Sequence, residues 1–424
     1  TILSEILREL GVRVPATDLA TTSSLAGALL RLEVRLMRKG LRFEARPASE
    51  LTPEQRLRMD ACWTMATGLS LVHHLRATDF QARSLLVALE LGASERVLRA
   101  AALLGVSVSA DPIARRVGRR LMEGARELAR SSPTPETQAW LSLTRGAAAM
   151  GDWDFATCVE SCRQAETDFR TRCTGAAWEV VSSQAFMLWS MTFQGELKAA
   201  GERLPSLLAS ARARGDRHAL ATLVLSPLHL VGLAANEPAR VRAECIETAG
   251  DWPEDWACFQ HMCAAYVLAQ VDLYEGNADA AWTHALRAWD MLRRSHLSRV
   301  QFQRVDLLGL RARAALASAG GQKREQRAWL VKARADAARL ERIGIDAAVG
   351  MASLVEAGAA CVEGRRDDAC RQLERAHARF ASRGMRLHAA VSRAGLGHPR
   401  DLAALGVADV TRMTRLWLPG RWMV

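Results

Sequence analysis

The sequence is poor in aromatic residues and has no long apolar run. Aromatic residues make up 5% of the 424 residues and β-branched runs are rare, which disfavours a sheet-rich fold. No stretch approaches the roughly 20 uninterrupted apolar residues that a membrane helix needs. The first five residues carry a charge and lack the order of a signal peptide. These absences predict a cytoplasmic protein that does not enter a membrane.

Methionine is missing from the first position, where Thr1 stands. The chain is therefore expected to be either a fragment of a longer polypeptide or a trimmed chain.

Lysine is almost absent, because only four of the 57 basic residues are lysine and the other 53 are arginine. The formal net charge is +11. The arginines are dispersed at helical spacing, as in Arg324 with Arg327, so we interpret them mainly as solvated helix faces and as a sign of a GC-rich coding sequence. No basic block is interleaved with aromatics, so a nucleic-acid-binding stripe is not favoured. Arginine-rich faces favour acidic partners.

The nine cysteines do not form a disulfide framework. Their number is odd, their spacing is irregular, and most lie in apolar helical patterns where cysteine packs as a small hydrophobe. A reducing cytosol fits this usage better than a secreted scaffold. Cys158 and Cys162 lie four apart on a predicted helix, but a zinc site would need two more ligands, and we expect buried packing.

The motifs of common enzyme sites are also absent. No Gly-x4-Gly-Lys-Ser/Thr phosphate loop, no Gly-x-Ser-x-Gly elbow, no His-Glu-x-x-His and no kinase motif set occurs. His73 and His74 with Asp79 could suggest proton transfer or a metal, but adjacent helical positions face different ways. We therefore predict no catalytic residue, no cofactor-binding residue and no metal ligand in this chain.

An internal repeat is the main positive signal. A short turn with Gly or Asn is followed within a few residues by Ala and an amphipathic run, and this pattern recurs at anchors 151, 195, 235, 276, 321 and 364. The steps of 44, 40, 41, 45 and 43 residues exceed the 34 of a tetratricopeptide repeat, which longer helices would explain. Glycine in the left-handed conformation is expected to end each first helix.

The repeat predicts an all-α, tetratricopeptide-like α-solenoid of antiparallel helical hairpins with longer than standard helices. Tryptophans at helical spacing, such as Trp140, Trp178, Trp189, Trp282 and Trp289, are expected to pack in its core. We expect three parts: residues 1–130 as an N-terminal helical region continuous with the array, 131–384 as the repeats, and 385–424 as C-terminal capping helices. Upstream, Pro53–Arg76 is expected to form one long helix with Thr52 as N-cap, and Phe80–Leu91 another that ends at Gly92.

Several segments resemble a known family. They include Leu36-Met37-Arg38-Lys39-Gly40-Leu41-Arg42-Phe43, Asp60-Ala61-Cys62-Trp63, Ala77-Thr78-Asp79-Phe80-Gln81-Ala82-Arg83, Arg172 to Glu179, Leu273 to Asn277 and Arg412 to Leu416. In these the chain resembles the C-terminal helical-repeat region of large bacterial serine/threonine protein kinases, which carry a kinase domain, an AAA-type ATPase segment and then this region. The resemblance implies a sensing or interaction arm and carries no catalytic residue.

The leading hypothesis is a non-catalytic protein–protein interaction or sensor module. It either captures a peptide or partner helix along the concave face, where arginines would favour acidic partners, or regulates an attached kinase or ATPase domain through the shape of the array. The alternatives are that the native protein is itself an ATP-dependent serine/threonine kinase whose catalytic domain lies outside this chain, or that the chain is the repeat arm of an ATPase-type transcription regulator. The candidate partner-binding residues, all expected on first helices, are Trp178, Glu179, His261, Gln301 and Arg304.

Overall fold

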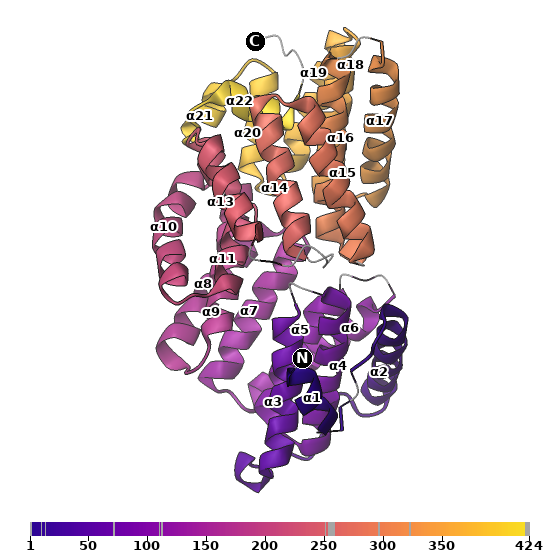
Figure 1. Cartoon of the computed structure of the whole chain (residues 1–424), viewed down its shortest axis with the longest axis vertical. Coiled ribbons are helices and arrows are strands. Elements are labelled where there is room, and N and C mark those ends of the chain that lie inside the picture. The colour runs from indigo at the N-terminus through magenta and orange to yellow at the C-terminus, as the bar shows by residue number, and fades with distance from the viewer. Residues whose placement is uncertain are drawn as a thin grey trace. The chain divides into compact units, whose positions relative to one another are not determined.

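The regular structure is helical throughout the described residues, which confirms the predicted all-α class. The computed structural model describes residues 2–9, 11–12, 14–70, 73–109, 111, 113–250, 252, 259–295, 297–321 and 324–419. Within these ranges there are 22 α-helices, two short 3-10 helices and no strand (Figure 1). None of the helices in these ranges is long and apolar enough to span a membrane.

The first half of the chain contains nine α-helices and one 3-10 helix. They are α1 (Ile2–Glu9), α2 (Asp18–Lys39), η1 (Ala48–Glu50), α3 (Pro53–Gly68), α4 (His74–Leu91), α5 (Ser94–Ser109), α6 (Arg115–Ser131), α7 (Pro135–Gly151), α8 (Phe155–Arg172) and α9 (Ala177–Phe193).

The second half contains the remaining helices. They are α10 (Leu197–Ala213), α11 (Arg217–Val224), α12 (His229–Ala234), α13 (Pro238–Gly250), α14 (Phe259–Glu275), α15 (Ala278–Arg294), η2 (Leu297–Arg299), α16 (Gln301–Gly321), α17 (Gln326–Ile343), α18 (Asp346–Val362), α19 (Arg366–Ala381), α20 (Arg386–Gly395), α21 (Arg400–Ala404) and α22 (Val410–Trp417).

The chain divides into two compact units. Unit 1 comprises Thr1–Ala148, Ser161–Gln184 and Ser295–Gln301, and unit 2 comprises Ala149–Glu160, Ala185–Arg294 and Phe302–Val424. In unit 1, α2 packs against α4 and α6, and α3, α4, α5 and α6 pack each on the next. In unit 2, α13, α14 and α15 pack in sequence, as do α17, α18, α19 and α20. The predicted limit at residue 130 falls in the last turn of α6, and the limit at 384 falls in the connection between α19 and α20; both stay predictions.

The predicted turns lie between helices. Gly195, Gly276 and Gly364 have φ of 76°, 89° and 76°, so glycine takes the left-handed conformation there, as expected. At two other anchors a different residue does so, because Trp153 and Asn236 each have φ of 60°. The turn expected at Gly320-Gly321-Gln322 runs into residues 322–323, which lie outside the described residues, as do Cys258 and residues 420–424.

The prediction of one long helix from Pro53 to Arg76 is wrong, because the helix is interrupted between α3 and α4. The start is as expected: Thr52 Oγ1 accepts from the Gln55 N–H at 3.2 Å, and Gln55 Oε1 accepts from the Thr52 N–H at 3.0 Å. Helix α3 ends at Gly68, and His73 becomes the N-cap of α4. Its imidazole also lies 3.0 Å from an Asp18 carboxylate oxygen at the start of α2. This contact between distant residues favours a new helix start at His74.

Gly92 joins α4 to α5 and lies close to the segment that follows α2. Its φ is 71°, and a Cβ atom placed on it would lie 2.2 Å from the carbonyl oxygen of Glu44. We expect Gly92→Ala to lower the free energy of unfolding by about 2–4 kcal/mol, because left-handed strain and a backbone clash add together. Gly344→Ala is the matched control, since its φ is 77° but nothing lies within 4 Å of the added methyl. Urea denaturation of both variants tests this, and equal losses would contradict it.

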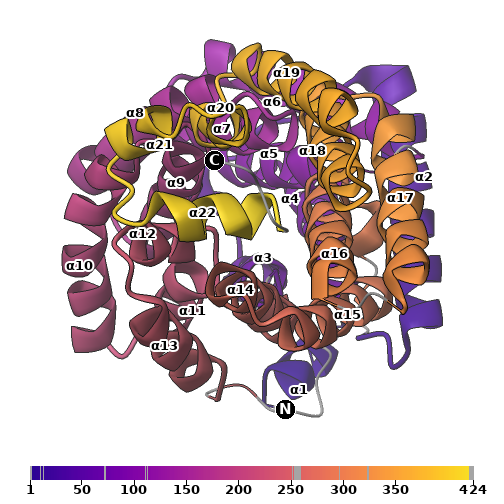
Figure 2. The same ribbon diagram turned by 90° about the horizontal axis from the view of Figure 1, so that it is seen from above.

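The C-terminal segment turns back into unit 2. Figure 2 shows α22 on the inner side of that unit, where it packs against α14 and α20. The Ala408 N–H donates to the Ala234 carbonyl at 2.8 Å, and Arg313 Nη1 donates to the Leu416 carbonyl at 2.9 Å. Met413, Leu416, Trp417 and Leu418 are all buried. The inner side of α14 in unit 2 is therefore occupied by the chain itself.

Candidate functional site

The five predicted partner-binding residues lie at different depths. Trp178 and Glu179 stand in the first turn of α9, and Glu179 is buried while Trp178 is half-buried. His261, in the first turn of α14, is buried. Gln301 and Arg304 stand in the first turn of α16, half-buried and exposed respectively. Trp178 and Glu179 belong to a defined cluster of side chains in unit 1.

This cluster is built around the indole of Trp140, which is 1% exposed. Trp178 stacks on it with ring centroids 6.2 Å apart, and Trp63 and Phe169 meet it edge-on at 5.4 and 5.9 Å. The Arg99 guanidinium lies over the Trp63 ring at 4.4 Å. Trp140 is thus a core residue, as expected, and Trp178 is held by packing.

The charged groups beside these rings have shifted pKa values. Burial raises the pKa of the Glu179 carboxyl and lowers that of the Arg99 guanidinium. Their attraction, together with Asp60 and Glu136, partly offsets the shift at Arg99. Such a cluster stabilises the helices from which its residues come. Its aromatic rings pack against one another.

The histidine pair is half-buried and the cysteine pair is buried. Asp79 is buried and binds Ser24 Oγ at 2.6 Å and Arg83 Nε at 2.8 Å. Burial lowers the pKa of His74 to about 4, so its imidazole is neutral at pH 7. Cys158 and Cys162 are both fully buried, which confirms that they pack in the core. In the part of the chain that the structure describes, no three His, Cys, Asp or Glu side chains are grouped to hold a metal.

A more open region lies along α6 in unit 1. A hollow of about 840 Å³ lies between the end of α2, the connection that follows it, and the second half of α6. It is lined by Arg38, Lys39, Gly40, Leu41, Arg42, Phe43, Ala45, Ser94, Gly124, Glu127, Leu128, Ser131 and Ser132.

A second hollow, of about 350 Å³, lies between α6 and α7. It is lined by Met122, Arg126, Ala129, Arg130, Gln138, Leu141, Ser142 and Arg145. The two hollows use neighbouring faces of α6, and each combines apolar side chains with cationic ones.

The cations that line these hollows have no acidic partner among the described residues. Glu127 is the one acidic residue among the lining residues, against six cations, and within the described ranges none of the six forms an ion pair with an acid. We call the two hollows and these six residues the α6 basic surface. The six are Arg38, Lys39, Arg42, Arg126, Arg130 and Arg145.

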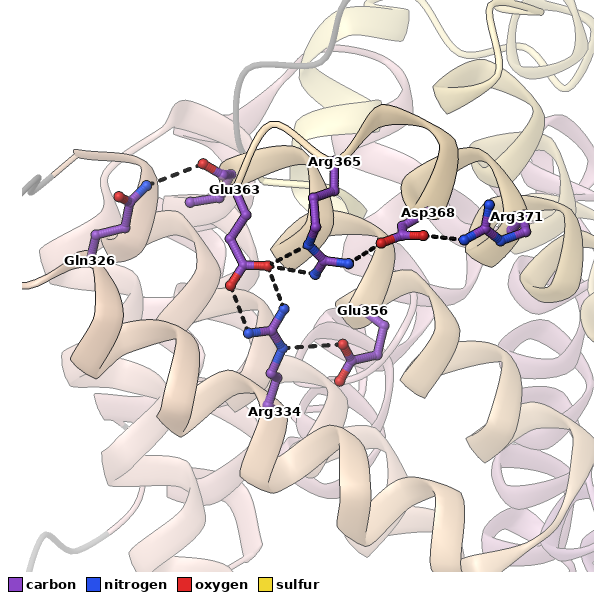
Figure 3. Close-up of polar contacts among 8 residues, drawn as sticks. Gln326, Arg334, Glu356, Glu363, Arg365, Asp368 and Arg371 are labelled. Carbon is purple, nitrogen blue, oxygen red and sulfur yellow. Dashed lines mark hydrogen bonds and ion pairs between the residues drawn. The ribbon is translucent and has the colours of Figure 1, made fainter.

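Arginines of unit 2 provide the contrast, and Figure 3 shows the clearest case. Arg334 holds Glu363 with two bonds of 2.8 and 2.7 Å and reaches Glu356 at 3.3 Å. Arg365 binds Glu363 and Asp368. The guanidinium bonds lower the pKa of Glu363 to about 2. These arginines join α17 to the turn between α18 and α19, and their charge is already neutralised.

The sequence carried only part of this information. Helix α6 has six arginines and two glutamates, a local excess that could have been counted. Whether an arginine has an acidic partner from another helix depends on the fold, and the even dispersion of arginine concealed the difference between α6 and α19. The α6 basic surface was therefore missed.

Comparison with protein-family models and with curated proteins finds no match for this chain. The α6 basic surface is thus interpreted from its own geometry.

Proposed function

We propose that this chain is a non-catalytic binding module that holds an acidic segment of a partner protein on the α6 basic surface. The observation that carries the proposal is that two adjoining hollows of one unit are lined by six cations, none of which has an acidic partner in the described part of the chain. A free guanidinium can bind a carboxylate without first breaking an internal ion pair. Its planar fork also suits two parallel bonds to one carboxylate.

Apolar residues in the same hollows would add contact area. Leu41 and Leu128 line the larger hollow, and Met122 and Leu141 line the smaller one. Burying apolar area contributes about 25 cal/mol per Å², whereas exposed charge pairs contribute little at physiological salt. The partner segment should therefore carry both acidic and apolar side chains.

The concave face was the expected place for a partner, but α22 lies along α14 on the inner side of unit 2. This arrangement favours the α6 basic surface over that face. A tetratricopeptide-like character of the hairpins and a cytoplasmic location belong to the same proposal.

The resemblance to kinase-associated repeat regions extends the proposal to a larger protein. The resembling segment Leu36 to Phe43 includes six residues that line the larger hollow, namely 38–43. This supports the view that the module serves as the interaction arm of a serine/threonine kinase. An immunoblot of host lysate tests the extension, because a native band no larger than 46.4 kDa would overturn it.

Charge reversal tests the binding proposal itself. We expect a fluorescein-labelled oligoglutamate to bind the wild-type chain, and the double variant Arg126→Glu, Arg145→Glu to bind it about tenfold more weakly or worse. Both arginines are exposed and lie in the interiors of α6 and α7, away from the helix ends. Fluorescence anisotropy at low and at physiological ionic strength gives the affinity.

The matched control is Arg287→Glu, Arg327→Glu, which changes net charge equally at exposed positions of α15 and α17. Equal weakening by both double variants would mean that only net charge matters, and the site would be rejected. Tighter binding of a DNA oligonucleotide than of oligoglutamate, with a steep salt dependence, would instead favour nucleic acid.

A further inference from the structure

In the connection between α2 and η1, the backbone groups along one edge contact the protein and, within the described residues, those along the other edge do not. Residues 42–47 run without a turn or bend. The carbonyl of Arg42 accepts from Arg35 Nη2 at 3.0 Å, and the N–H of Arg46 donates to the Gly92 carbonyl at 2.9 Å. The carbonyl of Glu44 lies against Gly92. The even-numbered residues therefore direct their backbone groups toward the protein.

The odd-numbered residues direct theirs the other way, because backbone groups alternate between the two edges of an extended chain. Phe43 and Ala45 both line the larger hollow, as Arg42 does, whereas Glu44 does not. Within the described residues, neither the Phe43 N–H nor the Ala45 N–H makes a hydrogen bond. Two successive edge positions thus offer backbone donors and acceptors, without a partner among the described residues, beside a hollow of about 840 Å³.

Cations stand beside this open edge. Arg38, Lys39 and Arg42 line the same hollow, and Glu127 is the single acid among its lining residues. An extended segment laid along an open edge gains main-chain hydrogen bonds, while its alternate side chains meet neighbouring groups. The charge of the lining residues selects acidic side chains for that role.

We propose that the partner binds as an extended acidic peptide, which pairs as an added strand with the open edge of Phe43 and Ala45. Its acidic side chains meet Arg38, Lys39 and Arg42. This proposal rests on the proposed function and specifies how the acidic partner is recognised: as a strand and not as a helix.

The test uses peptides of equal charge and different backbone. The probes are a labelled peptide of alternating valine and glutamate, two versions of it N-methylated on one or on the other set of alternate residues, and a hydrocarbon-stapled helix of alanine and glutamate. We expect the unmodified peptide to bind the wild-type chain at least about tenfold more tightly than the stapled helix and than one of the two N-methylated versions, the one whose methyl groups face the protein. Tighter binding of the stapled helix, or no effect of N-methylation on either set of alternate residues, would overturn the proposal.

A pair of variants tests the edge from the protein side. Ala45→Pro removes the backbone N–H at this position, whereas Ala45→Val keeps it. Both variants should fold, because Ala45 is exposed and its N–H has no partner among the described residues. We expect only Ala45→Pro to weaken the valine–glutamate peptide, by about tenfold. Should Ala45→Pro melt early, the N-methylated peptides still test the edge on the wild-type chain.

The outcomes separate the two proposals. Equal binding by Ala45→Pro and Ala45→Val, with weaker binding by Arg42→Glu, would reject strand pairing and leave the acidic-partner function in place. No binding of any acidic probe to the wild-type chain would reject the proposed function, and the strand proposal with it.

Discussion

Replacing Trp417 by alanine is expected to lower the free energy of unfolding by about 3–5 kcal/mol, the usual cost of truncating a buried aromatic residue. The indole is 2% exposed. It lies under the Arg313 guanidinium at 4.1 Å and against the His388 ring at 4.2 Å. Its removal leaves Arg313, itself 3% exposed, without its aromatic neighbour. Urea denaturation followed by circular dichroism measures the loss.

The large effect follows from the position of α22 in unit 2. Besides the bonds at Ala408 and Leu416, Arg412 Nη1 donates to Asn236 Oδ1 at 3.3 Å and Arg415 Nη1 to the Glu275 carbonyl at 3.5 Å. The segment thus connects the turn at Asn236 and the turn after Glu275, which lie some 40 residues apart in the sequence, to α16. Trp282→Ala is the control, because Trp282 is half-buried on α15 and should cost only about 1–2 kcal/mol. A smaller loss for Trp417→Ala than for Trp282→Ala would contradict this role.

The second large effect is a loss of stability in acid. Burial lowers the pKa of His388 to about 3 and that of His229 to about 4. In the unfolded chain both should titrate near the usual value of about 6.5. As the pH falls, the unfolded state therefore binds protons on these histidines at a higher pH than the folded state does. The free energy of unfolding should therefore decrease between about pH 6.5 and pH 4, by about 1.4 kcal/mol per pH unit for each histidine.

Buried acids act in the opposite direction, since burial also raises the pKa of Glu179 and of Asp79. Burial raises the pKa of Asp306 to about 6, so below that pH the folded state holds a proton that the unfolded carboxyl, with a pKa near 3.9, does not. His74, whose pKa burial lowers to about 4, acts with the other two histidines, so three histidines oppose these acids. The change in slope on removing one histidine is therefore the quantity that isolates its contribution. Urea titrations across this range measure it. His388→Leu should reduce the slope by about one proton, and an unchanged slope would contradict a neutral buried His388.

The helices and most turns could be predicted because their causes are local. Gly276 and Gly364 end helices through their own conformational freedom, and Thr52 caps α3 through a bond to a residue three positions away. The break before His74 could not be predicted in the same way. It is accompanied by a contact to Asp18, a residue 55 positions away, that no local pattern contains.

The α6 basic surface and the return of α22 were missed for the same reason. Arg126 and Arg375 look alike in the sequence, but Arg375 has Glu341 of α17 as its partner, and Arg126 has no acidic partner within the described residues. Likewise, the contact of Trp417 with Arg313 joins residues more than a hundred positions apart. Helical periodicity says which face of a helix is apolar, but it does not say which distant segment covers that face.

Hydrogen exchange with and without the valine–glutamate peptide tests the binding site most directly. We expect the bound peptide to slow exchange in residues 38–46, with the largest effect at the open amides of Phe43 and Ala45, and in the adjoining stretch of α6 and α7 from 122 to 145. Protection that is instead centred on α14 and α22 would place the partner on the inner side of unit 2 and contradict the α6 basic surface as the binding site.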